Sequence, residues 1–187
     1  MGTLPPLERS PSKCRHLGNR LPLLISGILL ATACSAPQAL LTSSGAPSRS
    51  AGVPEARLST LDGAATDLGH FLRGRAALVS FWATWCEACL TEMPALNRLS
   101  AEASAEGDAV VVGVAIGESQ DKVAGFVRAH HLLFAQLVDE DFRFTDAVGE
   151  RRVPTTLVVD RSRDIVFRGG ALDSESLDAF RRVAAAK

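Results

Sequence analysis

The chain has 187 residues, a formal net charge of -1 at pH 7 and 47% hydrophobic residues. These values fit one globular domain and argue against a nucleic-acid-binding protein, since no basic cluster interleaved with aromatic residues occurs. Only two of the four cysteines are close in sequence, which argues against a scaffold held together by several disulfides.

The first 33 residues have the organisation of a secretory signal peptide. Lys13, Arg15 and Arg20 precede an apolar run over residues 21–30, and small side chains follow. A basic region, a short apolar core and a small-residue end are typical of an exported protein. The run is shorter than the roughly 18 residues expected of a membrane-spanning helix, so we expect cleavage rather than a permanent span.

Cys34 directly follows this leader. The segment Leu30-Ala31-Thr32-Ala33-Cys34 resembles a bacterial lipobox, although Ala31 stands where leucine is usual. The resemblance implies that Cys34 becomes the lipidated first residue of a membrane-tethered lipoprotein facing the periplasm. The alternatives are an ordinary signal peptide cleaved near Ala36 and a leader that is retained as an anchor.

Residues 34–55 are rich in serine, alanine, proline and glycine and show no periodicity, which is typical of a flexible linker. A coil of about 20 residues has an end-to-end distance on the order of 25 Å, enough to lift a domain clear of a membrane. We therefore expect a signal peptide over 1–33, a lipid-anchored linker over 34–55 and a folded domain over 56–187.

The predicted domain alternates short apolar strands with amphipathic helices. Gly107 and Asp108 are expected to end the long helix after residue 90, and Pro94 is expected to kink it. Strands are predicted at 56–61, 76–81, 109–116, 133–138, 155–160 and 165–168, and helices at 66–72, 90–106, 119–130, 141–148 and from 173 or 174 onward. This order predicts an α/β domain with a mixed sheet.

Cys86 and Cys89 lie where the buried strand at 76–81 gives way to the long helix. The unpaired N–H groups and the positive dipole end of a helix start stabilise a thiolate, so Cys86 is the candidate attacking thiol. Cys89 is one turn further and can close a small disulfide ring as the resolving thiol. The pair predicts dithiol–disulfide exchange.

The segment Phe81 to Pro94, FWATWCEACLTEMP, resembles the active-site segment of the TlpA/ResA-type thioredoxin-fold proteins. Leu61-Asp62-Gly63 and Val153-Pro154-Thr155-Thr156 match the same family at the right spacing, and the similarity extends from Ala56 to Lys187. The resemblance implies a thioredoxin-like fold, with a mixed central sheet flanked by helices, an N-terminal β extension and a central αβ insertion around 119–133.

The resemblance also implies roles for residues outside the cysteine pair. Pro154 stands where this fold places a cis-proline facing the disulfide, which leaves the backbone of Val153 available to an extended substrate. Glu92 stands where the family has a glutamate that moves protons during exchange, and Ser80 replaces the buried aspartate of thioredoxin proper. Trp85 is expected to shield the cysteines; simple core packing is the alternative.

Glu87 is the residue from which we predict the direction of electron flow. Its negative charge beside Cys86 disfavours the thiolate, and a less stabilised thiolate makes a better reductant. We therefore expect a protein-disulfide reductase rather than a disulfide-forming oxidase.

Other uses of the two cysteines have to be weighed. A zinc site needs further ligands, for which His70, His130 and His131 are the available histidines, and haem attachment needs a histidine where Leu90 stands. A permanently closed structural disulfide between Cys86 and Cys89 is a further alternative. A peroxiredoxin-class thiol peroxidase needs threonine three residues before its cysteine, where Ala83 stands. A copper-delivery module using Cys86 and Cys89 as Cu(I) ligands is the non-catalytic alternative.

The resemblance implies disulfide-bearing protein substrates, apocytochrome c among them, and a membrane-embedded thiol as electron donor, because the compartment is oxidising. It implies no bound cofactor and no metal, and we expect a monomer. His130-His131 and Arg151-Arg152 are interpreted as surface features.

Overall fold

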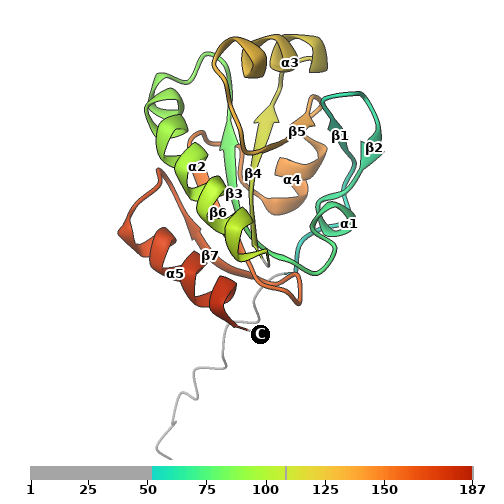
Figure 1. Ribbon diagram of the computed structural model, residues 1–187. Coiled ribbons are helices and arrows are strands. Elements are labelled where there is room, and N and C mark those ends of the chain that lie inside the picture. Colours follow the sequence, from blue (N-terminus) through green and yellow to red (C-terminus); the bar gives the residue numbers. More distant parts are fainter. Residues whose placement is uncertain (1–51, 108, 187) are drawn as a thin grey trace, which may run out of the picture. The chain divides into compact units, whose positions relative to one another are not determined.

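The computed structural model describes residues 52–107 and 109–186. The predicted signal peptide, Cys34 and most of the predicted linker lie outside this part of the chain. A single seven-stranded mixed sheet, in the order β2-β1-β5-β4-β3-β6-β7, organises the described residues (Figure 1). The strands are β1 Leu58–Thr60, β2 Ala65–Thr66, β3 Ala76–Trp82, β4 Ala109–Ile116, β5 Ala135–Asp139, β6 Thr155–Val159 and β7 Ile165–Gly169. Strands β3, β4 and β5 are parallel, whereas the other neighbouring pairs are antiparallel.

Helices cover both faces of the sheet. They are α1 Leu68–Leu72, α2 Glu87–Glu106, α3 Gln120–Ala129, α4 Arg143–Val148 and α5 Ser174–Ala185. Buried residues of α2, α3 and α5 form one apolar cluster, and those of α1 and α4 form a second cluster on the other face (Figure 1). The predicted thioredoxin-like α/β architecture is confirmed.

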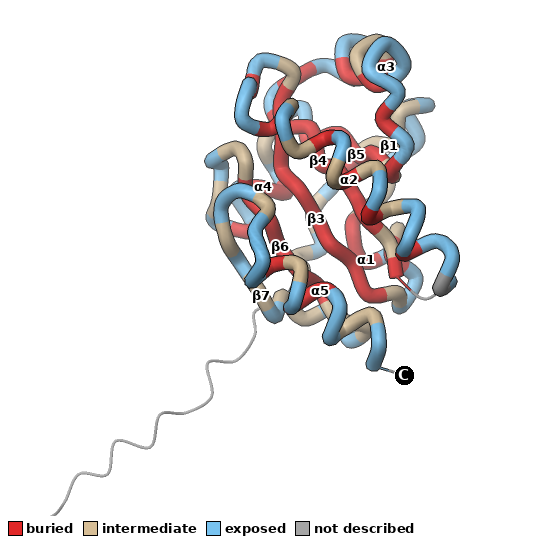
Figure 2. The backbone as a smooth tube through the Cα atoms, turned by 60° about the vertical axis from the view of Figure 1, so that its left-hand side comes forward, coloured by how far each residue is buried: buried red, intermediate tan, exposed pale blue. Residues whose placement is uncertain are grey.

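β3 is the central strand on which the two layers are built. All seven of its side chains are buried, as its continuous apolar composition predicted, and Figure 2 shows it buried along its whole length. Leu78 and Trp82 face the cluster of α2, whereas Val79 and Phe81 face that of α1 and α4. The strand therefore anchors the segment that follows Trp82 in a rigid core.

Helix α2 begins directly after Cys86 and ends at Gly107, which has a φ of 83°. A left-handed conformation of this kind carries no steric penalty for glycine, which explains why the helix stops there. Met93 and Leu96 are buried on the side of α2 that faces the sheet, and Pro94 lies inside the helix.

Some predicted boundaries at the edges are wrong. Thr66, expected to open a helix, lies in β2, because it pairs with Leu58 in a small hairpin. β5 begins at Ala135 instead of Leu133. The N–H of Leu133 donates a hydrogen bond to the Asn97 side chain at 2.7 Å, so it is not available for pairing with a neighbouring strand. α4 begins two residues later than expected, at Arg143.

The described chain starts at the end of the sheet remote from the cysteines. Gly52 forms an antiparallel bridge with Asp164, and the N–H of Val53 donates to the carbonyl of Arg163 at 2.8 Å. Within residues 52–107 and 109–186, no helix is long and apolar enough to cross a membrane.

Candidate active site

Cys86 and Cys89 form a disulfide at the start of α2, with their Cα atoms 5.3 Å apart. Cys86 is the N-cap of the helix: its Sγ accepts a hydrogen bond from the N–H of Cys89 at 3.2 Å. The sulfur thus meets the unpaired N–H groups and the positive end of a 20-residue helix. Both influences stabilise negative charge on Cys86 when the disulfide is reduced.

The two sulfur-bearing residues differ in accessibility. Cys86 is 6% exposed and Cys89 is 1% exposed, while Glu87 and Ala88 between them are exposed. An incoming group can therefore approach the pair from the side of Cys86. This difference fits the predicted attacking role of Cys86 and resolving role of Cys89.

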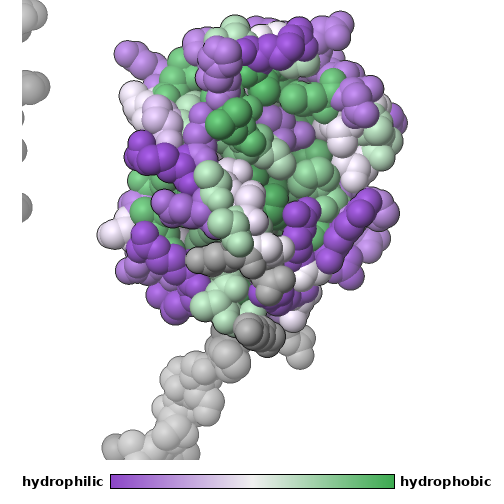
Figure 3. Space-filling model, in the orientation of Figure 1, coloured by the Kyte–Doolittle hydropathy of each residue, from purple (hydrophilic) through white to green (hydrophobic). Residues whose placement is uncertain are grey.

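Trp85 projects from the surface beside the disulfide. It is 67% exposed, so the alternative that it packs in the core is wrong. On the face seen in Figure 3, hydrophobic residues gather toward the middle and hydrophilic residues lie around the border. A large aromatic ring next to a reactive sulfur is available for contact with another protein.

The peptide bond between Val153 and Pro154 is cis, as expected. Thr155, the next residue, pairs with Phe81 near the end of β3, so Pro154 lies at the same end of the sheet as the cysteines. Val153 is half-buried and packs against both apolar clusters. The sheet register therefore brings the Val153–Pro154 segment and the loop before Cys86 to the same end of the sheet.

Glu92 lies three residues after Cys89 and is half-buried. One carboxylate oxygen accepts a hydrogen bond from the N–H of Leu172 at 2.9 Å, and the other is buried without a protein partner. Burial raises the pKa of Glu92 above its usual value, although the bond from Leu172 acts in the opposite direction. A carboxyl group with a raised pKa, on the same helix as the resolving thiol, is suited to accept and return a proton.

Ser80 and Thr156 place two buried hydroxyl groups in the middle of the sheet. They are register partners on β3 and β6. By strand alternation, Ser80 faces the same side as Leu78 and Trp82, which is the side that holds the disulfide. The Thr156 hydroxyl has no protein partner. Two hydroxyl groups therefore lie within the otherwise apolar layer between the sheet and α2.

Glu118, which the sequence did not single out, contacts the loop that carries the cysteines. It lies between β4 and α3, and its carboxylate accepts hydrogen bonds from the N–H of Thr84 at 2.7 Å and from the Thr84 hydroxyl at 2.6 Å. Lys122 makes an ion pair with the same carboxylate. The only local signal is the Glu–Lys spacing of four residues, which by itself indicates a solvated helix pair. The contact with Thr84 spans 34 residues and has no local signature.

The histidines and arginines predicted to be surface features are exposed. His130 stacks on Phe126 with ring centroids 3.9 Å apart, and Arg151 and Arg152 pair with Asp146 and Glu150. Among the described residues, no group of three or more His, Cys, Asp or Glu side chains is arranged to hold a metal ion.

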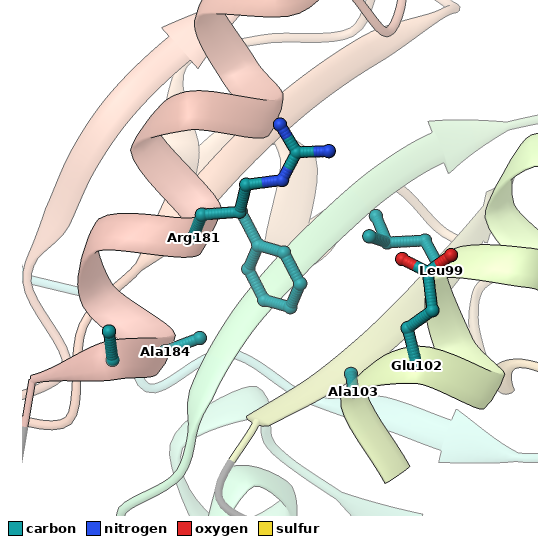
Figure 4. Close-up of a pocket in the computed structure, with 7 residues that line it drawn as sticks. Leu99, Glu102, Ala103, Arg181 and Ala184 are labelled. Carbon is teal, nitrogen blue, oxygen red and sulfur yellow. The ribbon is translucent and has the colours of Figure 1, made fainter. Parts of the chain in front are cut away.

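A hollow of about 310 Å³ lies between α2 and α5, lined by apolar side chains such as Leu99 and Phe180 and by the charged side chains of Glu102 and Arg181 (Figure 4). Leu99 follows Cys89 by ten residues, about 15 Å along the helix axis. The hollow is therefore separate from the disulfide and contributes nothing to its chemistry.

Comparisons with known proteins agree with this geometry. The sequence model of the Redoxin family matches residues 48–180. The thiol-disulfide oxidoreductase ResA of Halalkalibacterium halodurans is 29% identical over 124 residues, which are 66% of this chain and 69% of that protein. ResA of Bacillus subtilis is 30% identical over 51% of this chain, but the match spans only 52% of that relative. A secreted disulfide oxidoreductase of Mycobacterium tuberculosis has a TM-score of 0.56 at 26% identity, covering 71% of this chain and 96% of that structure.

Proposed function

We propose that this chain, which belongs to the redoxin family, is an extracytoplasmic thiol–disulfide oxidoreductase of the TlpA/ResA type that reduces protein disulfides. The observation that carries the proposal is the position of the cysteine pair. The sulfur of Cys86 is the N-cap of α2, and that of Cys89 is buried one turn further. This arrangement gives one thiol that is the more exposed of the two and has a stabilised thiolate, and one more deeply buried thiol that completes the reaction.

The reaction proceeds in two exchanges. The Cys86 thiolate attacks one sulfur of a substrate disulfide, forming a Cys86–substrate mixed disulfide and releasing the other substrate sulfur as a thiolate. Cys89 loses its proton and its sulfur attacks that of Cys86, which closes the Cys86–Cys89 disulfide and releases the second substrate sulfur as a thiolate. Two electrons pass from the dithiol to the substrate, and the two substrate thiolates take up two protons.

Glu92 is the proposed proton acceptor for Cys89. Its raised pKa brings the carboxyl group closer to the range in which proton transfer to and from a thiol is effective. The hydrogen bond from Leu172 fixes one oxygen, and the other is buried without a protein partner. Val153, Pro154 and the exposed Trp85 are the proposed substrate-binding residues.

Glu87 supports the reductive direction. It is exposed in the first turn of α2, where its charge opposes the helix dipole at Cys86. A less stabilised thiolate makes the dithiol a stronger electron donor. The purified protein should therefore have a reduction potential well below about −120 mV, the value of a strong disulfide-forming oxidase.

The proposed setting is the periplasmic side of a membrane. Residues 1–33 serve as the signal peptide, Cys34 as the lipid attachment site, and residues 34–55 as the linker to the domain at 56–187. Clients are disulfide-bearing proteins, with apocytochrome c as the client that a role in cytochrome c maturation requires. Because the compartment is oxidising, a membrane-embedded thiol protein returns the enzyme to its dithiol form.

A Cys89→Ser variant tests the function directly. Without the resolving thiol, the mixed disulfide on Cys86 persists, and mass spectrometry of the trapped species identifies the client. The matched control is Cys86→Ser, which retains a side-chain oxygen able to cap α2 but should trap nothing. Loss of trapping in both variants, with disulfide reduction still at the wild-type rate, would exclude the mechanism.

A further inference from the structure

The loop between β3 and α2 is hydrogen-bonded to a buried carboxylate from the loop between β4 and α3. Glu118 is 6% exposed, and its two oxygens accept the N–H and the hydroxyl of Thr84 at 2.7 and 2.6 Å. Thr84 is two residues before Cys86, and the N–H of Cys86 in turn donates to the carbonyl of Ala83 at 3.1 Å. The orientation of the reactive cysteine therefore depends on a short chain of bonds that begins at Glu118.

The charge of Glu118 strengthens this hold. Burial acts to raise the pKa of Glu118, but the hydrogen bonds from Lys122 and Thr84 outweigh it, and the pKa lies below its usual value. The group is therefore a carboxylate at neutral pH. Hydrogen bonds to an ionised acceptor are roughly twice as strong as those between neutral groups.

The segment that supplies Glu118 is itself fixed. Gln120, two residues later, donates to the carbonyl of Leu61 at 2.6 Å, and the N–H of Gly117 donates to the carbonyl of Asp139 at 2.9 Å. Lys122 completes the arrangement with an ion pair at 2.5 Å. The carboxylate therefore acts from a rigid base, so it can restrict the motion of the Thr84 loop.

We propose that Glu118 is a positioning residue for thiol–disulfide exchange: by binding both polar groups of Thr84 it holds the Cys86 loop in the geometry required for attack on a disulfide. This inference rests on the proposed function. An attacking sulfur has to lie in line with the disulfide, and a displacement of about 1 Å lowers such rates about 100-fold. Glu118 does not touch the reacting atoms, so its effect is transmitted through the loop.

The test compares two substitutions of Glu118 in the reduced protein. Glu118→Ala removes both bonds to Thr84 and should lower the pH-independent rate constant of Cys86 with oxidised glutathione about tenfold. Glu118→Gln retains an acceptor for the Thr84 N–H and a donor for its hydroxyl, and should keep that rate constant within about threefold of wild type. If Glu118→Ala does not fold, Thr84→Val, which loses only the hydroxyl bond, should show a loss of about threefold.

Asp139 provides a matched control. It is a buried carboxylate that accepts the N–H groups of Phe144 and Thr145 and the Thr145 hydroxyl, and so holds α4 on the other face of the sheet. Asp139→Ala removes the side chain but keeps the backbone carbonyl that accepts the Gly117 N–H, so it should lower the melting temperature while leaving the Cys86 rate constant unchanged.

The possible outcomes distinguish failure of the positioning role of Glu118 from failure of the proposed function. A Glu118→Ala or Thr84→Val protein that melts at a lower temperature but reacts at the wild-type rate would overturn the positioning role. Absence of any exchange between wild-type Cys86 and glutathione would instead overturn the proposed function itself.

Discussion

Gly113 offers a test of how tightly the core supports the active-site loop. It lies in the middle of β4 opposite Ser80, and a Cβ atom built there would lie 2.5 Å from Oε1 of Gln136, 2.8 Å from Nε1 of Trp82 and 2.8 Å from the Phe134 ring. Trp82 and Gln136 are joined by a buried hydrogen bond of 3.1 Å. A Gly113→Ala substitution therefore has to separate two buried polar groups or move the last residue of β3.

The expected loss of stability follows from these contacts. Overpacking of one methyl group in a dense core costs about 1–3 kcal/mol, and a buried hydrogen bond that is broken costs about 1–3 kcal/mol. Because the core relaxes in part, we expect the free energy of unfolding to fall by about 3 kcal/mol in total. For a domain of this size, that loss corresponds to a fall in melting temperature of about 10 °C. Far-UV circular dichroism measures the transition. Trp82, the buried one of the chain's two tryptophans, reports the local change by fluorescence.

Gly125 is the matched control. It lies within α3, and a Cβ atom added there meets nothing within 4 Å. Gly125→Ala should raise stability by about 0.5–1 kcal/mol, because alanine is the better helix former. A Gly113→Ala melting temperature within about 2 °C of wild type, or an equal loss in Gly125→Ala, would refute the packing argument.

Three further results are expected. Burial raises the pKa of Glu92, so the folded state holds the carboxyl proton more tightly than the unfolded state. The contribution of Glu92 to the free energy of unfolding is therefore complete below about pH 4.3 and is lost as the pH rises through the pKa of the folded state. Glu92→Gln should therefore raise the melting temperature at pH 7 but not at pH 3. In stopped-flow experiments the same variant should slow release of the mixed disulfide at least about 100-fold, and equal release rates would contradict the proton-transfer role. Trp85→Ala should slow reduction of a protein disulfide about fivefold without changing the melting temperature or the rate with glutathione, and an equal loss with both substrates would argue against a binding role. Asp173→Ala removes the capping box formed with Ser176 and should cost about 1 kcal/mol in denaturant titrations, whereas Ser174→Ala should cost nothing measurable.

The buried elements were predictable because their composition is local information. β4 has the predicted bounds Ala109–Ile116, and β3 extends the predicted strand by one residue, to Trp82. The end of α2 at Gly107 was also predicted, and Asp173, one of the two residues predicted to cap α5, is its cap, since each boundary depends on one residue with a strong conformational preference. The first sulfur at the helix start followed from the same strand–helix junction.

The parts that the sequence could not predict depend on contacts between distant residues. Asn97 shortens β5 from another element, and Leu172 binds Glu92 across 80 positions of the chain. Glu118 resembles an ordinary surface residue until the fold brings it to Thr84. Periodicity reports which face of an element is buried, but it does not report which side chain satisfies a polar group on a different element.

The pairing of Gly52 with Asp164 fixes where a linker before the domain would join it relative to the disulfide. β6 begins beside the cysteines with Thr155 and ends at Val159, so Gly52 enters at the base of the sheet (Figure 1). If residues 34–55 tether the domain as proposed, the linker would join it about 23 Å, the length of seven strand residues, from the end of the sheet that carries the disulfide. Linker length and domain height together would then define a working distance, and a client would be reduced only if its cysteines lie within that distance of the membrane.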